Sequence, residues 1–358
     1  MKIDEKFLKE YLDANSPTGF EYQLGGQKLW MEHMEKFADK VDIDNYGTAY
    51  AVIENKNSNF KVVIEAHADE ISWFVRSIDS KGYIRVVRNG GSDHQIAPSM
   101  RVTLWGEKGP VTGVFGHPAI HISYRGDKVD LDSIFIDVGA SNAKEVESMG
   151  INIGTVITFS DGFMKLGENY YTGRALDNRI GGFMIAEVAR KLKEKGRQLP
   201  FNLYIVNSVQ EEVGLYGASM ITHTIKPDVA IVTDVCHETG APCYNASKEG
   251  TYEAGKGGVI TRAPAVHNIL RKLVLDTAKK KKIPFQLSAS SRSTGTDTDA
   301  FAFSNGGVPA VLISLPLKYM HTTVETVHKK DVKNVINLIY HTLLNIEENH
   351  NFKYNKEN

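Results

Sequence analysis

The stretch that decides the fold runs from residue 60 to residue 69 and reads Phe60-Lys61-Val62-Val63-Ile64-Glu65-Ala66-His67-Ala68-Asp69. It begins with a short, mostly apolar run, which is typical of a buried strand. Two side chains suited to metal chemistry, His67 and Asp69, follow where this strand ends. In open α/β sheets, ligands bind just outside the carboxyl ends of the strands. The stretch therefore predicts a strand that delivers functional residues to a site.

The chain changes character immediately after this strand. From about Ile71 to Phe159 it consists of short β-rich pieces that Gly and Pro interrupt, together with one short helix at Ala143–Met149. The expected strands are Ile71–Ile78, Tyr83–Val87, Arg101–Leu104, Val111–Phe115, Ile134–Val138 and Val156–Phe159. This spacing predicts a small β-sandwich or β-barrel.

The segments on either side of the β-rich region indicate a second kind of structure. The first part is expected to hold helices at Phe7–Leu12 and Glu21–Phe37, and strands at Lys40–Ile43 and Thr48–Ile53. From about Gly173 onward, helices and strands alternate: Asn178–Lys195, Phe201–Val209, Ala218–Thr224, Val229–Val235, Pro264–Lys282, Phe285–Ala289, Ala310–Leu315 and Lys329–Glu348. Such alternation predicts an α/β fold, a central and mostly parallel sheet flanked by helices. We expect residues 1–70 and 166–358 to form this domain and residues 71–165 to be inserted into it.

Composition excludes several classes of function. The chain has 358 residues, with 42 basic and 43 acidic side chains and a net charge of −1, so it lacks the basic excess of a nucleic-acid-binding protein. It contains no apolar run of about 18 residues that could span a membrane, and its first residues do not resemble a signal peptide. Cys236 and Cys243 are too few for a disulfide framework and suit a reducing compartment. We therefore expect a cytoplasmic protein that binds neither nucleic acid nor membrane.

Metal-binding side chains recur where the predicted elements begin or end. G-x-S-x-G, P-loop and H-E-x-x-H motifs are absent from the sequence. The recurring positions are His67 and Asp69 after Val62–Ala66, Glu211 and Glu212 after Leu203–Val209, Asp234 after Ala230–Thr233, His321 after Val311–Leu315, and Asp177 before the helix at Asn178. Taken alone, each has an ordinary structural explanation; Asp177, for example, is typical of a helix N-cap.

Taken together, two histidines and three carboxylates match a dinuclear metal site. Mixed nitrogen and oxygen ligands suit zinc, cobalt or manganese rather than calcium. Two divalent ions about 3.5–4 Å apart need a bridging carboxylate, and a further, unbound carboxylate must take the proton of the attacking water. A turn at the strand end, which Gly214 and Gly217 favour, would bring both Glu211 and Glu212 toward one site. Asp69 is well placed to accept the second ring N–H of His67.

At these residues the chain resembles a known family, the tetrahedral (TET-type) metallo-aminopeptidases of the co-catalytic dizinc peptidase clan, which includes glutamyl and deblocking aminopeptidases. The matching motifs appear in family order and cover nearly the whole chain. They are Ser16–Glu21, Ala66–Ile71, Ala175–Arg179, Gln210–Gly214, Thr233–Val235, Gly295–Asp297 and Met320–Thr322.

The resemblance implies a role for each residue. The implied metal ligands are His67, Asp177, Glu212, Asp234 and His321, with Asp177 bridging two divalent ions per subunit, for which zinc or cobalt is favoured. Glu211 would be the general base and Asp69 the partner of His67. The β-rich insert would be a dimerisation domain in a homo-oligomer, from a dimer to a dodecamer. The implied activity is release of N-terminal residues from short peptides.

The sequence departs from the family pattern at Cys236-His237-Glu238, so it leaves the preferred N-terminal residue open. Three other functions are weighed beside the aminopeptidase. The first is an N-acyl deacylase or carboxypeptidase-like amidohydrolase that uses the same metals. The second is a glycosidase that uses Glu211 and Glu212, although adjacent carboxylates match poorly the opposed pair, about 5–9.5 Å apart, that glycosidases need. The third is a non-catalytic scaffold, which would not need the complete ligand set.

Overall fold

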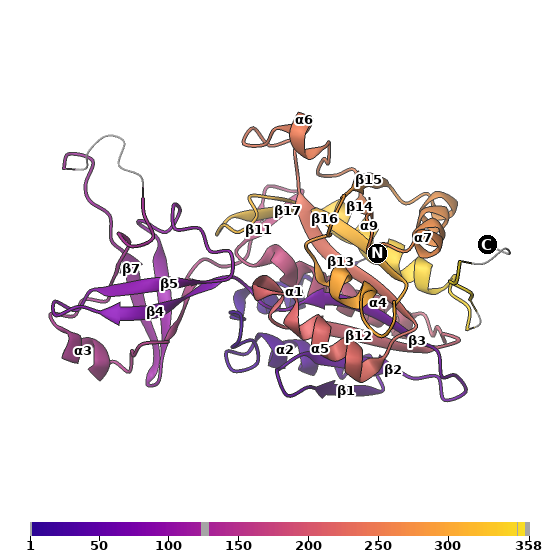
Figure 1. The fold of residues 1–358 in the computed structure, drawn as a ribbon, viewed down its shortest axis with the longest axis horizontal. Helices are drawn as coiled ribbons and strands as arrows, with labels where there is room; N and C mark the ends of the chain where they lie inside the picture. Colours follow the sequence, from indigo (N-terminus) through magenta and orange to yellow (C-terminus); the bar gives the residue numbers. More distant parts are fainter. Residues whose placement is uncertain (1, 123–128, 349, 355–358) are drawn as a thin grey trace.

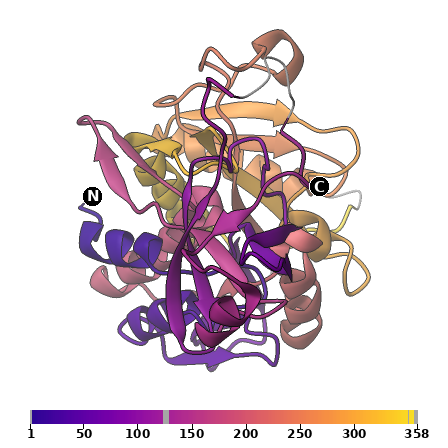
Figure 2. The same ribbon diagram turned by 90° about the vertical axis from the view of Figure 1, so that its left-hand side faces the viewer.

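The computed structural model describes residues 2–122, 129–348 and 350–354. It contains a larger α/β part and a smaller β-barrel that stands beside it (Figure 1). Figure 2 views the same molecule from the side of the barrel. Each part has its own cluster of buried apolar side chains.

The α/β part is built on one sheet with β3 (Lys61–His67) near its centre. The strand order is β1-β2-β12-β3-β13-β16-β17-β11-β10, and β14 pairs with β15 and with β16. Strands β12, β3, β13 and β16 run parallel to one another, and antiparallel strands extend both edges, so the expected α/β fold with a mostly parallel centre is confirmed. The other strands are β1 (Lys40–Ile43), β2 (Ala49–Ile53), β10 (Met164–Leu166), β11 (Tyr170–Gly173), β12 (Asn202–Ser208), β13 (Val229–His237), β14 (Gly258–Arg262), β15 (Phe285–Ala289), β16 (Ala310–Lys318) and β17 (Glu325–His328).

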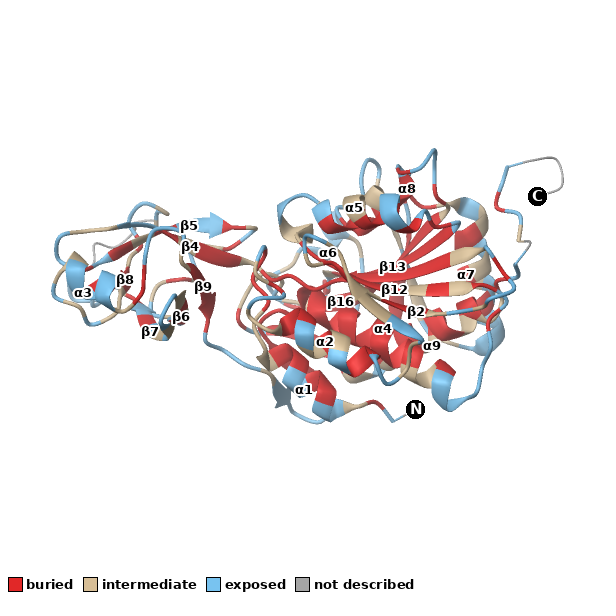
Figure 3. Ribbon diagram, turned by 90° about the horizontal axis from the view of Figure 1, so that it is seen from below, coloured by how far each residue is buried: buried red, intermediate tan, exposed pale blue. Residues whose placement is uncertain are grey.

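Helices cover both faces of this sheet. Figure 3 shows α5 and α8 on one face and α1, α2 and α4 on the other, with the strands between them buried. The helices are α1 (Glu5–Asp13), α2 (Gly26–Met34), α4 (Leu176–Glu194), α5 (Tyr216–Ile225), the short α6 (Ala246–Glu249), α7 (Asn268–Lys281), α8 (Asp297–Ala302) and α9 (Lys329–Leu343).

Helix α4 lies unusually close to β3. A Cβ atom at Gly181 would lie 2.8 Å from the Cβ of Ala66, which is too close for any residue but glycine. Trp30 ties the same turn of α4 to α2, because its indole N–H donates to the carbonyl of Gly182 at 3.0 Å. The beginning of α4, which carries Asp177, is thereby held near the strand end that carries His67.

The smaller part is a closed barrel with the strand order β4-β5-β8-β7-β6-β9. Its centre is filled by buried side chains such as Trp73, whose ring meets that of Phe115 edge-on with 5.7 Å between centroids. The expected β-rich insert is thus a barrel. Its strands are β4 (Ser72–Ile78), β5 (Ile84–Asn89), β6 (Arg101–Gly106), β7 (Gly109–Phe115), β8 (Ile136–Asp137) and β9 (Val156–Phe159), accompanied by α3 (Ala143–Ser148).

Several element boundaries differ from the sequence-based expectations. Helix α2 begins at Gly26 rather than at Glu21, because the carboxylate of Glu21 accepts hydrogen bonds from the backbone amides of Gly19 and Gln210 instead of starting a helix. The last helix ends at Leu343 rather than at Glu348. The sequence pattern does not predict strands β10, β11, β14 and β17 or helices α6 and α8. Among the described residues, no helix combines the length and the apolar character needed to cross a bilayer.

Candidate metal centre

The candidate residues converge at the carboxyl edge of the parallel strands. His67 is the last residue of β3, and Asp234 lies in β13, which continues to His237. Glu211 and Glu212 lie in a 3-10 turn (Glu211–Val213) after β12. Together with Asp177 and His321, these four residues line one cavity of about 630 Å³.

Asp177 lies between the two histidines. Its Oδ1 is 3.2 Å from Nε2 of His67, and its Oδ2 is 3.4 Å from Nε2 of His321. Around the first histidine, Oδ1 of Asp234 is 3.8 Å from Nε2 of His67. Around the second, Oε2 of Glu212 is 3.4 Å from Nε2 of His321. One oxygen of Asp177 therefore faces the pair His67–Asp234, and its other oxygen faces the pair His321–Glu212.

Within the described residues, three groups offer ligand atoms that lie within 4.8 Å of one another. Two of the groups share Asp177, and the third contains Glu211. The groups are His67–Asp177–Asp234, Asp177–Glu212–His321 and His67–Glu211–Glu212. The first two describe neighbouring metal positions with a common carboxylate, which is the arrangement that a dinuclear site requires.

Asp69 organises the turn that carries the two glutamates. Its Oδ1 accepts the backbone N–H of Glu211 at 3.0 Å, and its Oδ2 accepts that of Glu212 at 3.2 Å. The hydroxyl of Thr18 donates to the same carboxylate at 2.8 Å. Asp69 also lies 3.3 Å from Nδ1 of His67, but this nitrogen is not aligned for a hydrogen bond. The geometry thus gives Asp69 a role in shaping the turn that the sequence did not suggest.

The site gathers carboxyl groups where burial disfavours their charged form. Burial raises the pKa of Glu211 to about 10, and Asp234 and Asp297 act in the same direction while His67 opposes them. Burial likewise raises the pKa of Glu212 and of Asp234. Carboxylates held this close together repel one another and attract a cation.

Imidazole contacts act in the opposite direction on Asp177. Although burial raises its pKa, hydrogen bonds from His321 and His67 outweigh burial and lower it. Burial lowers the pKa of His321, but its contacts with Asp177 and Glu212 prevail and raise it to about 11. The positive imidazole rings thus stabilise the negative charge of Asp177. A bound cation would stabilise that charge in the same way.

Some important side chains were not identified from the sequence. Glu325 accepts the backbone N–H groups of both Asp177 and His321. Glu70 forms buried ion pairs with Arg174 and Arg179. Glu325 lies outside every motif quoted from the sequence, and Glu70 lies within Ala66–Ile71 without a role of its own there. The partners of both come from segments far away along the chain. The N-cap position of α4 is Ala175 rather than Asp177, and the carboxylate of Asp177 faces His67 and His321, so the interpretation of Asp177 as a helix cap does not apply.

The barrel reaches into the edge of the site. A Cβ atom at Gly91, in the loop after β5, would lie 2.6 Å from Nδ1 of His321, and one at Gly90 would lie 3.2 Å from the Cβ of Glu212. The rest of the cavity is lined by apolar, sulfur and hydroxyl side chains. These are Leu215, Val235, Cys236, Ser293, Thr294, Thr296 and Met320, together with His237 and Asp299.

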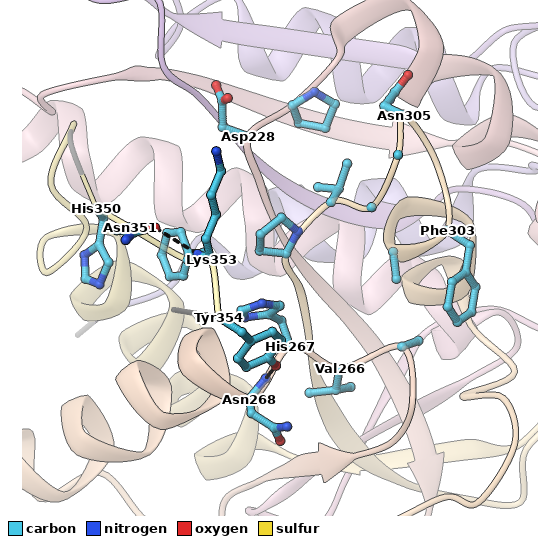
Figure 4. Close-up of a pocket in the computed structure, with 18 of the residues that line it drawn as sticks. Asp228, Val266, His267, Asn268, Phe303, Asn305, His350, Asn351, Lys353 and Tyr354 are labelled. Atoms are coloured by element: carbon cyan, nitrogen blue, oxygen red, sulfur yellow. Dashed lines mark hydrogen bonds between the residues drawn. The ribbon is translucent and has the colours of Figure 1, made fainter. Parts of the chain in front are cut away.

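A second, larger cavity of about 1060 Å³ lies at the opposite edge of the sheet, where strands begin. Figure 4 shows Asp228, Val266 and Phe303 in its lining, with Tyr354 stacked on His267 at a centroid distance of 4.7 Å. None of the metal-binding groups found among the described residues lies there. The groups that could hold a metal ion thus lie at the carboxyl edge of the sheet, where ligands bind in open α/β sheets.

Comparisons with known proteins show which family the chain is similar to. Residues 47–338 match the model of the M42 glutamyl aminopeptidase family. A lysyl aminopeptidase of Pyrococcus furiosus is 37% identical over 340 residues, which cover 94% of this chain and 95% of that protein.

Two solved structures are similar along almost their entire length. A TET aminopeptidase from a marine sediment archaeon of the Thaumarchaeota superimposes with a TM-score of 0.90 at 30% identity and covers 96% of both chains. The TET1 peptidase of Pyrococcus horikoshii, described as assembling into a tetrahedron or a large octahedral shell, has a TM-score of 0.82 at 25% identity and covers 94% of this chain and 98% of its own.

Proposed function

The chain belongs to the M42 glutamyl aminopeptidase family and is a metal-dependent aminopeptidase, and from this premise we propose how its site works. Two divalent ions, zinc or cobalt, are held by His67, Asp177, Glu212, Asp234 and His321, and N-terminal residues are released from short peptides. The observation that carries this proposal is the position of Asp177, whose two oxygens face two different histidines.

The donor set fits such ions. It combines imidazole nitrogen with carboxylate oxygen, the mixture that zinc and cobalt accept. The raised pKa values of Glu211, Glu212 and Asp234 reflect burial without enough compensating charge. Divalent cations would provide that charge and would keep Glu211 ionised, as a general base must be. When bound, the ions supply Lewis-acid polarisation of the peptide carbonyl and lower the pKa of the attacking water.

Glu211 is the general base in this proposal. Its carboxylate faces the same cavity, with Oε2 3.8 Å from Nε2 of His67, and it belongs to neither of the two groups that share Asp177. It takes a proton from the attacking water and delivers that proton to the nitrogen of the leaving amine. Asp69 holds Glu211 in place through the backbone bond described above.

The test is hydrolysis of matched short peptides with free and N-acetylated amino termini. The assay is run with the purified protein, then after treatment with a chelator, and then with zinc, cobalt or manganese restored. We expect cleavage of the free peptides only, lost with the chelator and recovered with metal. Cleavage of acetylated peptides would support a deacylase instead. Activity that resists the chelator would refute the metal mechanism.

We also propose that residues 71–165 form a dimerisation domain within a homo-oligomer. Apolar side chains lie exposed on this region at Val114, Ile122 and Ile153, and exposed apolar surface is typical of interfaces. Light scattering after size-exclusion chromatography tests this. We expect a dimer or a larger assembly that Ile153→Asp weakens, and a monomer at all concentrations would refute it.

We also propose that the protein is cytoplasmic. The free thiols of Cys236 and Cys243 support it, because structural disulfides are rare in reducing compartments.

A further inference from the structure

We propose that Glu325 is a positioning residue that fixes the spacing between Asp177 and His321, and thereby the affinity of the site for both metal ions. This inference rests on the proposed function, in which Asp177 and His321 are ligands.

Glu325 is the first residue of β17 and is 2% exposed. Its Oε2 accepts the backbone N–H of Asp177 at 2.9 Å. Its Oε1 accepts the backbone N–H of His321 at 2.7 Å. Each carboxylate oxygen thus holds a different segment, although Asp177 and Glu325 are 148 residues apart in sequence.

The segments that carry Asp177 and His321 depend on the hydrogen bonds to Glu325, because regular secondary structure fixes the backbone of neither residue. His321 has a φ of 61°, in the left-handed region that residues other than glycine rarely adopt. Asp177 has φ −78° and ψ 111°, so its backbone is not helical although α4 begins one residue earlier. A left-handed conformation such as that of His321 persists only where surrounding contacts impose it. Glu325 makes such a contact with both residues.

The geometry also separates Glu325 from the ligands themselves. Among the residues that the structure describes, Glu325 belongs to none of the groups that could hold a metal ion. Its two oxygens face backbone amides instead. The carboxylate of Glu325 positions Asp177, the candidate ligand shared by both metal positions, and His321, a candidate ligand of one of them. Loss of this carboxylate should therefore weaken the binding of both ions.

The experiment compares Glu325→Gln with Thr326→Val in the full-length protein. Glutamine keeps the size of the side chain, but its single carbonyl oxygen can accept only one of the two amides, and its NH₂ group faces the other. The neighbouring Thr326 is the matched control. Its buried hydroxyl bonds with Thr172 and with the carbonyl of Val324, so Thr326→Val also removes buried hydrogen bonds in β17, but away from the site.

The first readout is the affinity for zinc, measured by competition with a chromogenic chelator, and the second is the melting temperature of the metal-free protein. For Glu325→Gln we expect a zinc affinity lower by about 10- to 100-fold, the usual effect of losing a partner that orients a ligand. For Thr326→Val we expect a lower melting temperature with unchanged zinc affinity. With saturating zinc, Glu325→Gln should lower kcat more than it changes KM.

Wild-type zinc affinity in Glu325→Gln would overturn the inference, and so would an equal loss of affinity in both variants. If the wild-type protein itself binds no divalent ion, the proposed function fails rather than this inference alone. If Glu325→Gln does not fold, Glu325→Asp replaces it, since the shorter carboxylate keeps the charge but cannot reach both amides. Normal affinity in Glu325→Asp would refute the inference equally.

Discussion

Replacing Gly91 with alanine should weaken metal binding without unfolding the protein. Gly91 lies in the barrel, yet the atom that alanine would add points at a candidate ligand in the α/β part. The added Cβ would lie 2.6 Å from Nδ1 and 2.8 Å from Cε1 of His321. The backbone of Gly91 does not have a positive φ, so alanine introduces a contact and no backbone strain.

The size of the effect follows from these distances. Ordinary contact begins at about 3.4 Å, so the imidazole must retreat by 3.4 − 2.6 = 0.8 Å, or the loop must move by as much. Metal–ligand distances tolerate deviations of about ±0.2 Å. A shift several times larger should lower the affinity for the ion at His321 by about 10- to 100-fold, as other disturbances of ligand orientation do.

The assay is a zinc titration in the presence of a competing chelator. We expect one of the two ions to be lost at chelator concentrations that leave the other bound. Gln95→Ala is the control, because its exposed side chain lies in the same loop. If Gly91→Ala binds two ions with unchanged affinity, the loop that carries residue 91 moves away from His321 without disturbing the site. That result would refute the argument that the barrel restrains His321.

Three further outcomes follow from the site and its surroundings. Glu211→Gln should keep its metal content and lose about 10²- to 10⁴-fold in turnover; parallel metal analysis and kinetics check this, and near-normal turnover would remove Glu211 as the base. Glu70→Gln should lower the free energy of unfolding in urea by about 3–5 kcal/mol, because it leaves the buried guanidinium groups of Arg174 and Arg179 without their carboxylate; a loss below about 1 kcal/mol would fit only a weak surface pair. His33 stacks on Phe7, and burial lowers its pKa from 6.5 to about 4. The unfolded chain therefore takes up the proton first, and stability should fall as the pH drops from about 6.5 to about 4. His33→Phe should flatten that part of a plot of melting temperature against pH, and an unchanged slope would contradict the assignment.

The strands at the centre of the sheet and the residues at their ends could be predicted from the sequence. A strand buried on both faces needs a continuous apolar run, and β3, β12, β13 and β16 all show one. The edge strands carry no such signal. Both Met164 and Leu166 of β10 are exposed, and β17 reads Glu-Thr-Val-His, so no periodicity marks either strand.

Some residues of the candidate site could not be predicted from the sequence, and the cause is different from that for the edge strands. Asp177 has an ordinary interpretation as a helix cap, and only the joint pattern of metal-binding side chains pointed to another role. Glu325 and Gly91 could not be found in this way. Glu325 acts on backbone amides that come close only after folding, and Gly91 acts by the space that it leaves empty. Functions that depend on main-chain hydrogen bonds or on missing atoms leave no recognisable residue pattern.

The central place of β3 has a consequence for synthesis of the protein on the ribosome. This strand is made early, but its neighbours β12 and β13 begin only at Asn202 and Val229. The last candidate ligand, His321, emerges later still. Long-range parallel pairing of this kind is slow and must await distant segments. A nascent chain therefore cannot bring the candidate ligands together before the segment that carries His321 has been made.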